Sequence, residues 1–142
     1  MTATRLFSAT TAAVFALTLA ACSDTTATSN SDVLGHWGLS TINGAGLPFT
    51  MDTLPDARLE IFEDNIVLQG DGTLAGGTTW RVVDHDGVRE TLKIAARGRW
   101  VRTGDAVRIT FEEIGSANTT TAALGERSLT LEGNGYVFVY RR

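Results

Sequence analysis

The chain has 142 residues, of which 16 are acidic and 12 are basic, and its formal net charge at pH 7 is −4. An acidic chain argues against nucleic acid as a partner, because nucleic-acid binding needs a basic face, and it argues against attraction to anionic lipid. Cys22 is the single cysteine, so the sequence excludes an internal disulfide and a second thiol for a metal site.

Residues 1–21 are predicted to be a secretory signal and not part of the fold. Arg5 places a positive charge near the N-terminus, and residues 6–21 are uncharged and rich in Ala, Leu, Val and Phe. This stretch is shorter than the roughly 20 strongly apolar residues that a membrane span needs. It ends in Leu19–Cys22 (L-A-A-C), which resembles the lipobox of bacterial lipoproteins. The resemblance implies that the signal is cut before Cys22 and that a lipid on its sulfur anchors the protein. An ordinary signal peptide with a chance cysteine is the alternative.

Residues 22–32 are interpreted as the lipidated cysteine and a flexible linker, because Ser23–Asp32 contains no large apolar residue. Residues 33–142, roughly 110 in number, are enough for one domain with one core. Loss of Arg5 with the signal leaves 11 of the 12 basic residues against 16 acidic ones, a net charge of −5, so the lipid must do the anchoring. Ser23 favours the outer membrane over the inner one. We expect a monomer in the bacterial cell envelope, facing the periplasm.

The domain that follows is predicted to be all β. Short apolar stretches alternate with polar residues and are separated by Gly, Asp and Asn, which is typical of strands joined by tight turns. Such short loops join antiparallel neighbours, so strand order along the chain should be strand order around the sheet. A meander of eight to ten short strands closes most naturally into a single up-and-down β-barrel. The expected strands are Leu34–Ile42, Arg58–Phe62, Ile66–Gln69, Thr78–Asp84, Val88–Ala95, Arg99–Arg102, Ala106–Glu112, Thr119–Leu124, Ser128–Leu131 and Tyr136–Arg141.

Alternation also assigns one apolar face to these strands, which a barrel wall turns inward. The last strand is apolar on both faces, and the loop Leu47–Leu54 is expected to cover one of them. The residues assigned to the apolar face of the preceding strands are Leu59, Ile61, Trp80, Val82, Leu92, Ile94, Val107, Ile109, Phe111, Leu129 and Leu131.

The first strand opens with Gly35-His36-Trp37, a G-x-W sequence, and together with the meander of hairpins this resembles lipocalins and their calycin relatives. In that family the tryptophan plugs one end of the barrel and an arginine near the last strand packs across its ring. The resemblance therefore implies structural closure of the barrel by Trp37 with Arg141 or Arg142. The chain departs from the family in lacking the typical disulfide and in being shorter than most lipocalins.

A closer resemblance is to small lipocalin-like bacterial lipoproteins of unassigned function, and it covers nearly the whole mature domain. It rests on Ile42–Pro48 (I-N-G-A-G-L-P), Leu68–Thr73 (L-Q-G-D-G-T), Gly98–Trp100 (G-R-W) and the ending Val139–Arg142 (V-Y-R-R). The resemblance implies the fold and adds no chemistry.

No catalytic constellation or metal site is predicted. Asp84-His85-Asp86 is interpreted as a solvated hairpin tip, because strand neighbours point to opposite faces and Asp86-Gly87 is a strong turn signal. The only other histidine is His36, so a zinc site lacks ligands. The arginines at 89, 97, 99, 102 and 108 are interpreted as solvated positions rather than a basic stripe. The acidic residues Glu60, Glu63, Asp64, Glu112 and Glu113 are likewise assigned to the barrel exterior and to turns.

The function expected first is binding of a small hydrophobic ligand inside the barrel, lined by Trp80, Trp100, Phe111 and Phe138. Fold analogy supports it, although a barrel of about eight strands is just wide enough for its own side chains or one small ligand. The alternative is a protein-binding envelope module, inhibitor-like or scaffold-like, with a filled barrel. Its partner would touch Leu47, Phe49 and Met51 in an exposed apolar loop. Neither reading includes an enzyme or a cofactor.

Overall fold

The computed structural model describes residues 30–113 and 116–142. The predicted signal, Cys22 and most of the predicted linker lie outside these residues. Among the described residues, no helix has the length and apolar character needed to span a bilayer. The described elements are the 3₁₀ helix η1 (Asn30–Asp32) and the strands β1 (Gly35–Ile42), β2 (Ala45–Gly46), β3 (Phe49–Thr53), β4 (Ala57–Leu68), β5 (Thr73–Asp84), β6 (Gly87–Thr103), β7 (Ala106–Glu113), β8 (Ser116–Leu124), β9 (Ser128–Gly133) and β10 (Tyr136–Arg141).

The strands form one antiparallel sheet that closes on itself. From β4 to β10 each strand pairs with the next along the chain, and β10 pairs with β1. Closure comes from β1, whose first half, Gly35–Gly38, pairs with Asn65–Leu68 of β4. The ring therefore contains eight strands, β1 and β4–β10, while β2 and β3 lie outside it. The predicted single up-and-down barrel is confirmed.

Two strands each join two of the strands that the sequence pattern indicated, and β5 begins five residues earlier than predicted, at Thr73. β4 joins the predicted strands Arg58–Phe62 and Ile66–Gln69, ends one residue short of the latter at Leu68, and is continuous because it stays paired with β5 across a bulge between Ile61 and Glu63. β6 likewise joins the two predicted strands Val88–Ala95 and Arg99–Arg102. In both cases the local loss of alternation was interpreted as the end of a strand.

The barrel is packed at one end. Trp37, Ile66, Leu68 and Ile109 are fully buried there, and Trp100 is 4% exposed. Val33, also fully buried, precedes the ring and accepts a 2.9 Å hydrogen bond from Trp37 Nε1 through its carbonyl. These side chains fill the cross-section, so this half has the interior of an ordinary globular core.

Charged groups cap the same end. The guanidinium of Arg142 lies 4.3 Å from the ring centroid of Trp37 and donates to the Asp32 carbonyl. Arg102 binds the Asp32 carboxylate, and its hydrogen bond lowers the pKa of that carboxyl. Of the two arginines that the resemblance offered, the structure places Arg142 on the tryptophan, and both side chains are exposed.

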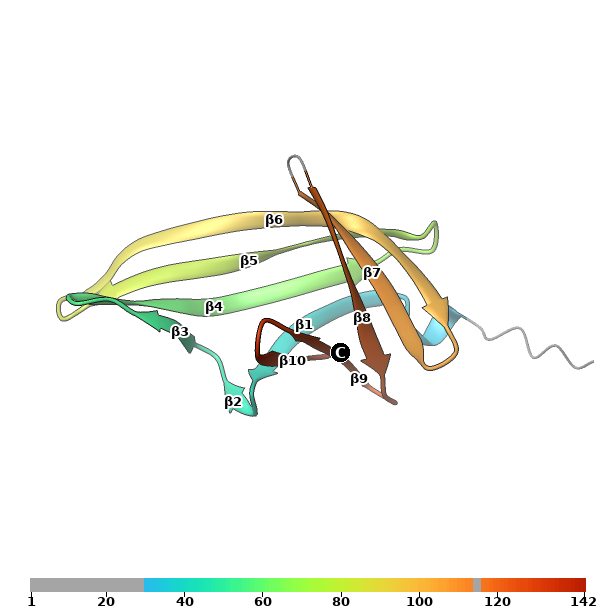
Figure 1. Ribbon diagram of the computed structural model, residues 1–142, viewed down its shortest axis with the longest axis horizontal. Helices are drawn as coiled ribbons and strands as arrows, with labels where there is room; N and C mark the ends of the chain where they lie inside the picture. The colour runs from blue at the N-terminus through green and yellow to red at the C-terminus, as the bar shows by residue number, and fades with distance from the viewer. Residues whose placement is uncertain (1–29, 114–115) are drawn as a thin grey trace, which may run out of the picture.

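The other end of the barrel is open. β4, β5 and β6 continue side by side past the strands that complete the ring, as the long bands in Figure 1 show. Within the described residues, β6 pairs with β7 only from Gly98 onward, whereas its residues 87–97 pair with β5. The outer half of the sheet is therefore a curved wall that extends past the closed ring.

Candidate functional site

The inner face of the open half forms a hollow of about 380 Å³. Strand register turns Ile61, Trp80 and Phe111 toward it, because cross-strand partners share a face. Phe138 and Tyr140 of β10 and Leu131 of β9 supply the opposite wall. Aromatic and aliphatic side chains thus make up most of its lining, with polar groups at a few points, as in small-molecule sites generally.

The floor of this hollow is polar and centres on Asp64 of β4. The Thr78 hydroxyl of β5 donates a 2.7 Å hydrogen bond to Asp64 Oδ2, and the Tyr140 hydroxyl of β10 donates a second one. Burial, which disfavours the ionised form, raises the pKa of Asp64 from its ordinary value of 3.8 to about 6. Burial and the neighbouring Asp64 also raise the pKa of Tyr140, so its hydroxyl stays protonated and donating.

Asp64 faces inward because of the bulge in β4. Ile61 pairs with Trp80, and after the extra residue Phe62 the pairing resumes with Glu63 opposite Thr79 and Asp64 opposite Thr78. One inserted residue moves each of the following side chains of the strand to the opposite face of the sheet. The expectation that Asp64 lies on the charged exterior was therefore wrong. A bulge has no sequence signature as plain as a turn, and the break in alternation at Phe62–Asp64 was its only trace.

A second hollow, of about 250 Å³, opens sideways between β6 and β7. It shares Asp64, Thr78, Phe111 and Tyr140 with the first hollow, so the two meet at the polar floor. Its outer rim is formed by Ile94–Arg97 of β6 and Glu112 of β7. The gap exists because the pairing of β6 with β7 begins only at Gly98 opposite Phe111.

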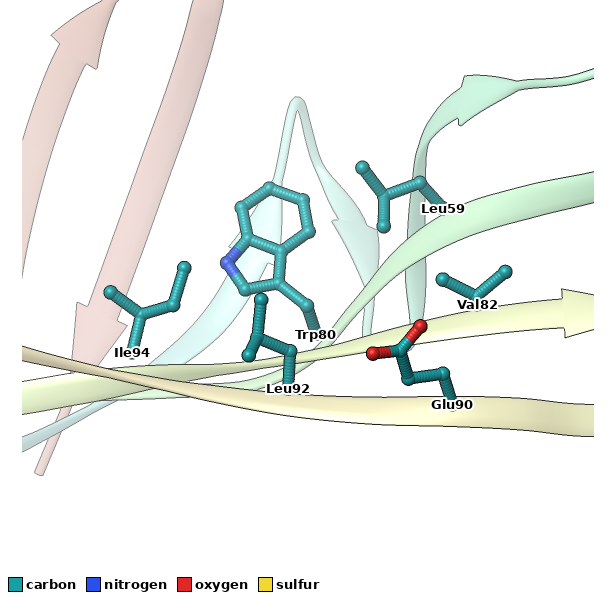
Figure 2. Close-up of a pocket in the computed structure, with 6 residues that line it drawn as sticks. All are labelled: Leu59, Trp80, Val82, Glu90, Leu92 and Ile94. Carbon is teal, nitrogen blue, oxygen red and sulfur yellow. The ribbon is translucent and has the colours of Figure 1, made fainter.

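Apolar side chains continue outward from the floor along the free wall. Figure 2 shows Leu59, Trp80, Val82, Leu92 and Ile94 on one side of β4, β5 and β6, with Glu90 at the far end. We call these five apolar residues the apolar shelf. They line a depression of about 240 Å³, which Trp80 links to the first hollow and Ile94 to the second. Leu92 is 53% exposed and Ile94 is 49% exposed, although both lie on the inner face.

Three of the four predicted ligand-lining residues meet in this site. Trp80, Phe111 and Phe138 line the first hollow. Trp100 lies in the packed half instead, where its Nε1 donates a 2.9 Å hydrogen bond to the Gln69 carbonyl. Its inward orientation follows from alternation, but its depth along the barrel depends on where β6 joins β7.

The expected exposed loop at Leu47–Met51 is corrected by the structure. Phe49 starts β3, which pairs with β4, and its ring contacts Tyr136 edge-on at 6.1 Å between centroids. Leu47, Phe49 and Met51 are half-buried and pack against the core. The β3–β4 pairing turns them inward, so they cover β10, as expected of this segment, and do not form an exposed apolar patch.

Two further expectations concern charged residues. The carboxylate of Asp84 accepts from the Asp86 backbone N–H at 2.8 Å and pairs with Arg89 at 2.9 Å, which fits the predicted hairpin tip. His85 contacts Asp86 at 3.2 Å, because both occupy the turn, so the argument that they face apart was wrong. Glu60 does lie on the outer face, but it is 7% exposed and is paired with Arg58 at 2.5 Å.

No protein-family model and no curated protein matches the chain. Among solved structures it is similar to a lipocalin-like protein from Bacteroides uniformis, with 16% identity over 78% of this chain and 98% of that chain and a TM-score of 0.43. An uncharacterized protein from Bacteroides eggerthii has 13% identity over 77% and 98% of the two chains, and its TM-score is also 0.43. The eight-stranded closed meander, with Trp37 and Arg142 at its packed end, makes this chain a lipocalin-like β-barrel.

Proposed function

We propose that this protein binds a small hydrophobic ligand in the open half of its barrel, as a lipid-anchored protein of the bacterial envelope. The observation that supports ligand binding is the division of the interior into a packed half and an open half. A barrel that needed only stability would gain by packing side chains across the hollow, because covering apolar surface stabilises a fold by roughly 25 cal/mol per Å². Leu92 and Ile94 are left half-exposed on the inner face, where a ligand would cover them.

The alternative, a protein-binding module with a filled barrel, has less support. It required an exposed apolar patch around Phe49, and Phe49 is half-buried against Tyr136. The anchoring part of the proposal is carried by the lipobox-like sequence that ends at Cys22.

Native mass spectrometry of the protein, produced from the full chain in a bacterial host and released from its membranes, tests both parts. A bound mass that is lost on organic extraction is expected, together with a chain that begins at Cys22 and carries acyl groups. Ligand-free protein that also takes up no added apolar compound would overturn ligand binding. A chain that keeps its first 21 residues, or lacks acyl groups, would overturn the anchor.

Variants on a single strand locate the ligand. Leu92→Ser removes an apolar contact from the shelf and is expected to weaken ligand affinity several-fold, because a ligand would cover the exposed half of a side chain whose full burial contributes about 1.5–3 kcal/mol. Val101→Ser is the matched control, since Val101 lies on the outer face of the same strand and is 52% exposed. Equal losses in the two variants would argue against binding at the shelf.

A further inference from the structure

The chemistry of the floor limits what the inner end of a ligand can be. Both hydroxyls that contact Asp64 use their protons on its carboxylate, so they present no donor to an incoming group. A carboxylate has about four lone-pair sites, which leaves roughly two for a ligand to donate to. A group that brings N–H or O–H donors therefore fits this floor, and a group that only accepts does not.

The charged residues that line the two hollows also favour a ligand head group that donates hydrogen bonds. The charged residues that line the first and second hollows are Asp64 of β4, Arg97 of β6, Glu112 of β7 and Glu132 of β9. Three are acidic and one is basic, and Arg97 lies on the rim of the lateral gap and is exposed. The other polar side chains that line the first hollow beside the floor are neutral: Asn118 and Thr120 of β8 and Asn134 of the β9–β10 turn. An anionic head group would meet repulsion at the floor, whereas a cation would gain a partner.

The apolar shelf indicates the shape of the rest of the molecule. Trp80 joins the shelf to the first hollow and Ile94 joins it to the second, so a continuous apolar path leads from Asp64 to Val82 and Leu59. A chain lying along this path would cover the exposed faces of Leu92 and Ile94. At the inner end of the path the lining offers the partly buried carboxylate of Asp64.

We propose that the site takes a cationic amphiphile, whose protonated amine binds the Asp64 carboxylate between Thr78 and Tyr140 and whose apolar body lies along the apolar shelf. This inference rests on the proposed function and specifies its ligand class. It excludes fatty-acid carboxylates with the head group at the floor. It also gives Asp64 a role that packing alone does not, since an apolar side chain would fill the same space at lower cost.

Three probes with the same alkyl chain and different heads test the proposal: octylamine, octanol and octanoate. The protein is produced from the full chain and carried in nanodiscs of zwitterionic lipid, with empty nanodiscs as the blank, and binding is followed by calorimetry. At about pH 8, octylamine is expected to bind roughly tenfold more tightly than octanoate. The preference is no larger because water in the open hollow weakens the attraction between the amine and Asp64. Asp64→Asn is expected to bring that ratio to about one. Glu63→Gln, the adjacent carboxyl on the outer face, should leave it unchanged.

The unmutated protein gives an independent check. Lowering the pH to about 5 protonates Asp64, so octylamine should bind roughly tenfold more weakly while octanol binding stays constant. Equal affinity for amine and carboxylate, or tighter binding of the carboxylate, would overturn this inference and leave hydrophobic ligand binding intact. Failure of all three probes to bind would count against the proposed function itself. Preference for the amine that survives in Asp64→Asn would also overturn the role given to Asp64.

Discussion

Two carboxyls of β4, the buried Glu60 and the partly buried Asp64, show how differently the barrel treats acidic residues. Glu60 lies in the outer wall with the guanidinium of Arg58 at 2.5 Å. Asp64 lies in the inner wall, and the partners that donate to it, Thr78 and Tyr140, are neutral. Hydroxyl groups compensate burial of a charge only in part, which is why the pKa of Asp64 is raised. An interior acid kept at such a cost is a candidate functional group.

Replacement of Asp64 by Asn should make stability less dependent on pH. The pKa of Asp64 is about 6 in the folded protein and about 3.8 when unfolded, so between these values the folded state binds more protons. The free energy of unfolding should therefore fall as pH rises from about 4 to about 6 and stay low above it. Asp64→Asn is expected to be more stable than the parent by roughly 1–2 kcal/mol near pH 8, after discounting for partial access of water, and about equal near pH 4.

Urea unfolding at several pH values measures this difference. Glu63→Gln provides the matched control, because its carboxyl is exposed on the outer face of the same strand. A stability difference between Asp64→Asn and the parent that stays constant from about pH 4 to about pH 8 would show that Asp64 is not responsible for the pH dependence.

At the scale of strands, a glycine lies at the place where the barrel opens. Gly98 pairs with Phe111 at the last position where β6 and β7 are joined, and a Cβ added there would come within 2.1 Å of the Thr110 carbonyl oxygen. Close backbone approach is one of the reasons for glycine inside a strand. Beyond this point β6 pairs with β5, and the lateral gap between Ile94 and Phe111 begins.

Gly98→Ala should therefore weaken the whole barrel. The contact is with a backbone oxygen, which cannot rotate away, so β6 and β7 must separate, and a loss of about 3 kcal/mol is expected. Gly46→Ala is the control, because a Cβ there meets nothing within 4 Å and the effect should stay under about 1 kcal/mol. Equal shifts of the urea midpoints of the two variants would mean that close approach at Gly98 does not matter.

The strands also show what the sequence could and could not predict. Turn residues and alternation predicted the hairpins from β7 to β10 to within a few residues, because each strand there keeps one pattern from end to end. β4 was divided in two because its bulge at Phe62 interrupts the pattern, and the same error hid the inward orientation of Asp64. β3 was expected to be a loop, since its pairing depends on β4, which lies later in the chain. Local patterns do not contain such long-range partners.

At the scale of the molecule, alternation predicted the inner face correctly but not where the ring is complete. Leu92 and Ile94 have the same pattern as Ile109 and Phe111, yet the former are half-exposed and Ile109 is fully buried. The difference arises because β6 is 17 residues long and β7 only 8, so β6 extends beyond the end of β7. Relative strand length and stagger determine closure, and neither is a local property. The candidate site is the part of the barrel that this mismatch leaves open.

Closure at the packed end depends on a few contacts between residues 32–37 and Arg142, and this can be tested with adjacent arginines. Arg142 lies over Trp37 and donates to the Asp32 carbonyl, so Arg142→Ala removes a cation–π contact and a hydrogen bond and should cost about 1–3 kcal/mol. Arg141→Ala changes an exposed side chain one residue away and should cost under about 0.5 kcal/mol. Hydrogen exchange adds spatial detail: the amides of β1 and β10 should lose protection in Arg142→Ala before those of β5 and β6. Equal effects of the two substitutions would mean that strand pairing alone closes the ring and that the cap on Trp37 contributes little.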